Sequence, residues 1–234
     1  LQHDVFPLAR ILQLVQKYGQ GEMRRPVEIE FAVNFNPMEK NGTFYLLQIR
    51  PMVDVKADLD EDLENIDEKN LLLKSYNSLG HGVMEDIQDI IYVKTEGYSA
   101  SNNQLIAYDI EKLNRRFLDE GKNYVLVGPG RWGSSDTWLG IPVKWPNISA
   151  ARVIVEAGLT NYRIDPSQGT HFFQNLTSFG VGYFTINAYM NDGVYNQAAL
   201  DALPAVEETR FLRWVHFDRP LEVKMDGRKK IGVV

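Results

Sequence analysis

Apolar and polar positions alternate in two short runs within the first 51 residues. Residues 26–32 and 45–51 are biased towards β-branched and aromatic side chains, and the connection between them ends in Asn41-Gly42, a strong turn signal. This pattern predicts the two strands of one hairpin. A helix-like stretch, residues 5–18, precedes the hairpin and is followed by Gly19.

Beyond the hairpin, the pattern predicts a mixture of strands and helices. Residues 54–69 carry eight acidic residues and two lysines, with Leu59, Leu63 and Ile66 at spacings of four and three. This segment is expected to be an exposed linker that can form a short amphipathic helix. Strands are expected at residues 89–94, 123–127, 149–156, 181–187, 211–217 and 220–225, and helices at 108–120, between a capping Asp109 and Gly121, and at 196–203. The predicted fold class is α+β, with an N-terminal piece at 1–53, an acidic linker at 54–70 and an α+β domain at 71–234.

The composition is that of an ordinary globular protein of one or two domains, with 234 residues, 44% of them hydrophobic and 24% charged. A net charge of −6 argues against nucleic acid as the principal ligand, because affinity for the phosphate backbone comes from clustered Lys and Arg. The sequence has no run of about 18 apolar residues and no signal-peptide pattern, so neither a membrane span nor export is indicated. Without cysteine, disulfides and thiolate zinc sites are excluded, and a cytoplasmic location fits best.

The predicted hairpin places four polar side chains on one face. If it is symmetric about residue 39, Glu30 lies opposite Gln48 and Glu28 opposite Arg50, because side chains alternate between faces with a period of two. Glu30 and Gln48 offer oxygen ligands suited to Mg²⁺, which usually keeps phosphate and water as further ligands. Arg50 can balance Glu28 or hold a phosphate through its planar guanidinium group. The alternative is an ordinary hairpin with a solvated outer face, whose cross-strand pairs contribute roughly 0.2 to 1 kcal/mol each.

These segments resemble the end of the ATP-binding domain of the phosphoenolpyruvate synthase and pyruvate phosphate dikinase family. In that family a helix leads through YGRPxDIEWA to a strand ending in LxQxRP. Here Tyr18-Gly19, then residues 25–32 and then residues 46–51 follow in the same order, so that the resemblance covers residues 1–52. It implies an ATP-grasp fold, with Glu30 and Gln48 at the Mg²⁺-binding positions and Glu28 and Arg50 beside the nucleotide. Glu28 replaces the usual Asp of the family and preserves its charge.

A glycine-rich turn follows the strand predicted at 123–127. Gly128-Pro129-Gly130-Arg131-Trp132-Gly133 satisfies G-x-G-x-x-G, but the loop continues into residues 138–143, which are not helical in period, so a dinucleotide site is not indicated. Gly128, Gly130 and Arg131 are instead expected to present backbone N–H groups and a guanidinium group to an anion. The alternative is a tight structural turn packed by Trp132 and Trp138.

The second candidate site is the loop at 165–176, which contains Gly169-Thr170-His171. An imidazole at the start of a short helix can act as a nucleophile towards a phosphoryl group, and the helix N-terminus favours the resulting negative charge. The alternative is a histidine that bonds the loop backbone and packs on Phe172 or Phe173. In the resembled family the ATP-grasp domain is followed by a linker and a swivelling β/β/α domain, whose carrier histidine lies in a GGxTSHxA loop. Here a single Gly precedes Thr-His and Phe-Phe-Gln follows it, and another superposition would put Ser149 at the carrier position.

The resemblance therefore implies a fragment of a phosphoenolpyruvate synthase-like or dikinase-like phosphotransferase that uses ATP and Mg²⁺. His171 is the expected phosphoryl acceptor, and Arg50 is expected to support the transition-state charge. The full-length protein is expected to bind pyruvate or phosphoenolpyruvate, with no nucleic-acid or membrane partner, and the fragment alone is expected to be inactive. The alternative is a non-catalytic regulatory or anion-binding α+β domain attached to a decayed ATP-grasp hairpin.

Overall fold

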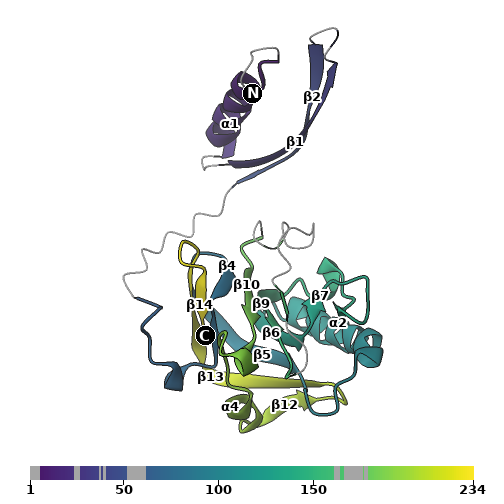
Figure 1. Cartoon of the computed structure of the whole chain (residues 1–234), viewed down its shortest axis with the longest axis vertical. Coiled ribbons are helices and arrows are strands. Elements are labelled where there is room, and N and C mark those ends of the chain that lie inside the picture. The colour runs from purple at the N-terminus through teal and green to yellow at the C-terminus, as the bar shows by residue number, and fades with distance from the viewer. Residues whose placement is uncertain are drawn as a thin grey trace. The chain divides into compact units, whose positions relative to one another are not determined.

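The computed structural model describes residues 6–23, 27–36, 38, 41–51, 62–160, 164–165, 176 and 179–234. The chain divides into two compact units, Leu1–Asp54 and Val55–Val234, and each is described by itself (Figure 1). No helix within the described ranges is long and apolar enough to cross a membrane.

The first unit consists of one helix and one hairpin. Helix α1 spans Leu8–Met23, strand β1 Val27–Asn36 and strand β2 Asn41–Pro51, and the two strands pair antiparallel. The helix packs on the apolar face of the hairpin, where Gly19 is buried so tightly that a Cβ would overlap the side chain of Ile49. On the same face Phe31 and Phe44 stack with their ring centroids 5.3 Å apart. The opposite face of the hairpin carries mostly polar residues, with the pair Ala32 and Tyr45 among them.

The second unit contains a large mixed sheet with helices packed against it. Its elements are β3 (Leu73–Ser75), β4 (Asn77–Leu79), β5 (Gly82–Val93), α2 (Asn103–Asp119), β6 (Tyr124–Pro129), β7 (Arg131–Trp132), β8 (Gly140–Ile141), β9 (Ala151–Ala157), β10 (Gly182–Ile186), β11 (Val194–Tyr195), α4 (Gln197–Asp201), β12 (Ala205–Glu208), β13 (Leu212–Asp226) and β14 (Ile231–Val233), with 3-10 turns η1 (Glu68–Asn70), η2 (Ala100–Asn102), η3 (Trp145–Asn147) and η4 (Ala188–Met190). The α+β class predicted from the sequence is confirmed.

The sheet curls until its two ends meet. Its strand order is β11-β3-β14-β13-β5-β6-β9-β10-β4, with β12 added beside β13. Strands β5, β6, β9 and β10 run parallel to one another, and the other pairings are antiparallel. Only Tyr76 separates β3 from β4, yet β3 pairs with β14 and β4 with β10. One short stretch of chain thus joins both ends of the sheet.

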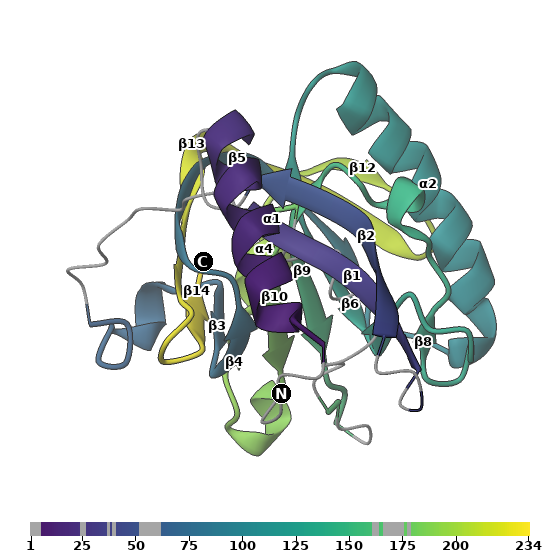
Figure 2. The same ribbon diagram turned by 90° about the horizontal axis from the view of Figure 1, so that it is seen from above.

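Both faces of the central strands are buried, which explains their nearly continuous apolar sequences. Helix α2 lies across the outer face, as Figure 2 shows, and its residues Ile106, Ile110, Leu113 and Phe117 pack in one cluster with Ile91, Leu126 and Ile154 of the sheet. The alternate strand residues form a second cluster on the inner face of the curled sheet. Its members include Ile90, Tyr92, Val125, Val127, Val153, Val155, Phe184, Val215 and Val223.

Two sequence predictions in this unit were wrong in detail. Helix α2 begins at Asn103, so Asp109 lies inside the helix and does not cap it. The Asn103 side chain is buried and donates to the carbonyl oxygens of Thr137 and Gly140, which fixes the early start. The strands expected at 211–217 and 220–225 are one long strand, β13, whose pairing with β5 shifts between His216 and Leu221. These irregularities let Pro220 sit in a continuous strand.

The acidic segment also differs from the expected exposed linker, as far as it is described. Leu63 is only 1% exposed and packs with Leu71, Ile231 and Val233, with Ile66 at the edge of the cluster. Residues 62–70 are therefore tied to the second unit.

The anchor of this segment is Lys74, a lysine that is 1% exposed. Its Nζ donates to the carbonyl oxygen of Glu64 and to the Glu68 carboxylate, both at 3.0 Å, and lies 5.1 Å from the centre of the Tyr76 ring. The buried ammonium group is thus paired, as a buried charge must be.

We expect Lys74→Met to lower the free energy of unfolding by about 1 to 3 kcal/mol, because Met replaces the apolar stem but leaves the Glu64 carbonyl and the Glu68 carboxylate without their donor. Urea unfolding followed by circular dichroism measures the change. Lys69→Met, an exposed lysine of the same segment, is the matched control and should change stability by less than about 0.5 kcal/mol. Equal effects of the two substitutions would contradict the anchoring role.

Candidate functional site

The register of the hairpin is the one expected from the sequence. Glu30 pairs with Gln48 and Glu28 with Arg50 across the antiparallel strands, and the register shifts only beyond Glu30, between Glu30 and Phe31. Because β1 and β2 alternate regularly up to this bulge, all four residues belong to the face opposite the apolar one. Directly opposed side chains have Cβ atoms about 4.5 to 5.5 Å apart, so the oxygen atoms of Glu30 and Gln48 can reach one cation.

The side chains of Glu30 and Gln48 are both exposed, whereas those of Glu28 and Arg50 lie outside the described part of the structure. Past the bulge the same face carries Ala32 opposite Tyr45, and then the opposed pairs Asn34–Thr43 and Asn36–Asn41. The exposed Tyr45 side chain therefore separates the amide and hydroxyl groups of these two pairs from Glu30 and Gln48.

The glycine-rich turn between β6 and β7 has a structural explanation. Gly130 and Gly133 both have φ of +77°, which other residues rarely adopt. Gly128 lies against the indole ring of Trp132, where a Cβ would overlap the ring. Of the two tryptophans expected to pack the turn, Trp132 is 2% exposed and Trp138 is 73% exposed, so only Trp132 does so. Anion binding by Arg131, which is half-buried, stays a prediction.

A buried carboxylate holds this turn in place. Glu156 on β9 is fully buried, and its carboxylate accepts hydrogen bonds from the backbone N–H of Trp132 at 3.0 Å and from the Tyr183 hydroxyl at 2.6 Å. The Thr185 hydroxyl in turn donates to Tyr183 at 2.9 Å. In the sequence Glu156 is merely the last polar residue of an apolar run, and its partners lie 24 and 27 residues away.

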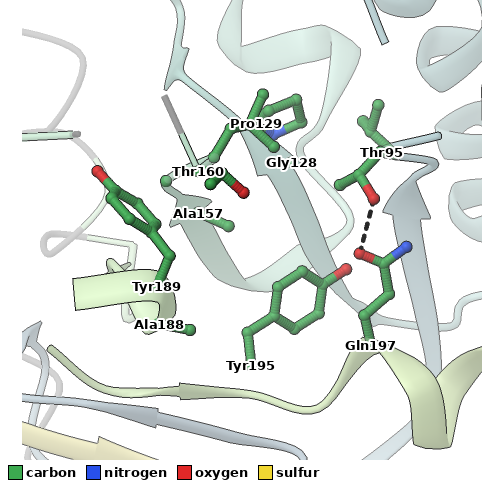
Figure 3. Close-up of a pocket in the computed structure, with 12 residues that line it drawn as sticks. Thr95, Gly128, Pro129, Ala157, Thr160, Ala188, Tyr189, Tyr195 and Gln197 are labelled. Carbon is green, nitrogen blue, oxygen red and sulfur yellow. Dashed lines mark hydrogen bonds between the residues drawn. The ribbon is translucent and has the colours of Figure 1, made fainter. Parts of the chain in front are cut away.

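A pocket of about 500 Å³ opens at the carboxyl ends of the parallel strands (Figure 3). Val93, Pro129 and Ala157 are the last residues of β5, β6 and β9, and all three line it. This edge is where sheets with parallel strands commonly bind ligands. The rest of its described lining consists of Thr95, Gly128, Gly158, Leu159, Thr160, Ala188, Tyr189, Tyr195 and Gln197.

Of the four histidines, His3 and His171 lie outside the described residues, and His81 and His216 can be placed. The predicted role of His171 therefore rests on the sequence. His216 on β13 bonds through Nδ1 to the buried carboxylate of Asp89 at 2.8 Å, and the same oxygen accepts the indole N–H of Trp214 at 2.7 Å. The His216 side chain is 41% exposed, which leaves an oriented imidazole at the surface. His81 accepts the backbone N–H of Gly227 at 3.3 Å.

Within the described ranges, no three His, Asp or Glu side chains gather as they would around a metal ion held by protein ligands alone. A Mg²⁺ ion that shares its coordination with phosphate and water needs only one or two protein ligands, so the Glu30–Gln48 pair is compatible with this finding. Comparisons of the chain with protein-family models, with curated proteins and with solved structures gave no match.

Proposed function

We propose that the chain is part of a phosphoenolpyruvate synthase-like or pyruvate phosphate dikinase-like phosphotransferase, in which the hairpin completes an ATP-grasp site for ATP and Mg²⁺. The observation that supports this proposal most directly is the register of β1 and β2, which opposes Glu30 to Gln48 and Glu28 to Arg50. If the register between the strands were shifted by one residue, one member of each pair would lie on the apolar face.

The donor set fits a magnesium–nucleotide complex. Glu30 and Gln48 supply hard oxygen ligands, and both side chains are exposed where a phosphate can approach. In the proposed site Arg50 neutralises charge on the transferring phosphoryl group, and Glu28 orients Arg50 across the strands. Bound Mg²⁺ would supply neutralisation and positioning of the phosphate oxygens.

His171 is the proposed acceptor. One imidazole nitrogen of His171 attacks the phosphorus atom, so that an N–P bond forms as the P–O bond to the nucleotide breaks and the nucleotide leaves with the electron pair. Pyruvate or phosphoenolpyruvate is the proposed second substrate of the full-length protein, acting in the cytoplasm.

Phosphoryl transfer to histidine can be tested by incubating the full-length protein with Mg²⁺ and ATP labelled at the β or γ phosphorus. We expect an acid-labile, base-stable phosphoprotein, whose label is lost in His171→Ala and is lowered at least tenfold in Glu30→Ala and Gln48→Ala. His216→Asn is the matched control, because His216 is the exposed histidine with a carboxylate partner. If His216→Asn lost the label and His171→Ala kept it, the acceptor would be His216 on β13. No label with either β-labelled or γ-labelled ATP would overturn the proposal.

A further inference from the structure

The pocket at the ends of the parallel strands is built differently from a phosphate site. Its described lining contains no Asp, Glu, Lys, Arg or His. Lys94, which follows β5 directly, pairs with Glu208 at 2.9 Å, and Asp201 at the end of α4 accepts the Tyr92 hydroxyl at 2.6 Å. These two charged groups beside the lining are therefore engaged elsewhere, and the described lining itself carries no charged side chain.

One polar group in this lining lacks a partner. The hydroxyl oxygen of Tyr195 is buried and makes no hydrogen bond to any described residue. Burial, with smaller contributions from Tyr92 and Asp201, raises the pKa of Tyr195, so the hydroxyl keeps its proton and remains a donor. A buried donor without an acceptor destabilises the free protein, and a ligand acceptor would remove that cost.

Two neighbouring polar side chains of the lining, Thr95 and Gln197, are fixed by a hydrogen bond between them. The Thr95 hydroxyl donates to the side-chain oxygen of Gln197 at 3.0 Å, which fixes the Gln197 amide at the start of α4. In Figure 3 Thr95 and Gln197 lie to the right of Gly128 and Tyr195, with the Tyr195 hydroxyl directed towards this pair. An amide group and a hydroxyl group side by side can recognise the edge of a ring that carries both acceptors and donors.

Aromatic and aliphatic side chains in the walls of the pocket can contact the faces of a planar ring. Tyr189 and Tyr195 come from the segment after β10, and Pro129 lies across from Tyr195 in Figure 3. Val93, Ala157, Leu159 and Ala188 add aliphatic surface. Aromatic side chains stack readily on planar heterocycles, and the volume of about 500 Å³ lies within the range of small-molecule pockets.

We propose that this pocket binds an uncharged planar heteroaromatic molecule of nucleoside size, with Tyr195 donating a hydrogen bond to an acceptor on its ring. The site belongs to the second unit alone and is independent of phosphoryl transfer at the hairpin. It assigns this unit a ligand different from the anion expected at the glycine-rich turn and from the phosphoryl group expected at His171.

Binding can be measured on the whole chain, without Mg²⁺, by isothermal titration with adenosine, guanosine and uridine as uncharged heteroaromatic probes. Pyruvate and inorganic phosphate serve as charged comparisons, and glucose as an uncharged compound without an aromatic ring. We expect at least one nucleoside to bind and the other three probes not to bind. Failure of every nucleoside at millimolar concentration, or binding of only pyruvate, phosphate or glucose, would overturn the proposal.

Three variants locate the binding. Tyr195→Phe should weaken nucleoside binding at least tenfold while the melting temperature of the free protein stays the same or rises, because the unpaired hydroxyl is gone. Ala188→Trp, at an exposed lining position, should abolish binding by filling the mouth of the pocket, whereas Ala202→Trp, an exposed alanine outside the lining, should leave it unchanged. Full binding by Ala188→Trp would place the ligand elsewhere, including at the hairpin, and would overturn the assignment. Phosphoprotein labelling of the same variants reports separately on the proposed phosphotransferase.

Discussion

Trp132→Ala is expected to lower the free energy of unfolding of the second unit by about 3 to 5 kcal/mol, among the largest effects of any single substitution in the chain. The indole is 2% exposed, packs beside Gly128, and donates through Nε1 to the carbonyl oxygen of Val155 at 3.0 Å. Its removal leaves a cavity and a buried carbonyl without its donor. Urea unfolding followed by far-ultraviolet circular dichroism measures the change, independently of tryptophan fluorescence.

Trp138→Ala is the matched control, since the Trp138 side chain is 73% exposed in the same loop, and it should cost less than about 0.5 kcal/mol. A second check uses Gly128, where an added Cβ overlaps the Trp132 ring although the backbone is not left-handed. Gly128→Ala should destabilise the natural sequence strongly and the Trp132→Ala variant much less, a coupling that a double-mutant cycle reports. Additive effects would show that Gly128 is required for another reason, such as ligand approach.

The hairpin shows how far a local pattern can be followed. Period-two alternation and the Asn-Gly turn determine which residues share a face, so the pairing of Glu30 with Gln48 could be predicted and is observed. The bulge beyond Glu30 could not be predicted, because nothing in the local sequence distinguishes the extra residue of β2 from its neighbours.

In the second unit, the longer strands β5, β6, β9, β10 and β13 and the helices α2 and α4 could be predicted, since each is a continuous apolar or amphipathic run, whereas the short strands β3, β4, β7, β8, β11, β12 and β14 were not. Their arrangement could not. The contacts that join β3 to β14 and β4 to β10, and the bond between Asp89 and His216, connect residues more than 100 positions apart. The same limit applies to the pocket, because nothing in the sequence distinguishes Thr95, Tyr195 and Gln197, and they lie together only where the strand ends meet.

The glycine-rich turn illustrates a different limit. The motif G-x-G-x-x-G shows which positions are glycine, but it does not reveal whether a backbone conformation, close packing or a ligand requires them. Here positive φ angles at Gly130 and Gly133 and the Trp132 ring beside Gly128 account for all three glycines without any ligand. The sequence alone does not show which of Trp132 and Trp138 is buried. In the structure, Trp132 is buried and hydrogen-bonded to Glu156 and Val155, whereas Trp138 is exposed.

Glu156→Leu is expected to lower the free energy of unfolding by about 3 to 5 kcal/mol, because a similar volume is kept while two buried donors lose their acceptor. These donors are the backbone N–H of Trp132 and the hydroxyl of Tyr183. Glu156→Gln keeps one carbonyl oxygen and should cost less, about 1 to 3 kcal/mol. The difference between the two variants, measured by urea unfolding, separates the loss of one acceptor oxygen from the loss of both.

The hydroxyl of Tyr183 provides the internal control for Glu156. In a cycle of Glu156→Gln, Tyr183→Phe and the double variant, we expect a coupling energy of about 1 to 3 kcal/mol, as is usual for residues that share one buried hydrogen-bond network. The bond is 2.6 Å long and both groups are fully buried, so water cannot replace either partner. If Glu156→Leu proved as stable as the natural sequence, Trp132 N–H would have another acceptor, and the turn after β6 would be held by Trp132 packing alone.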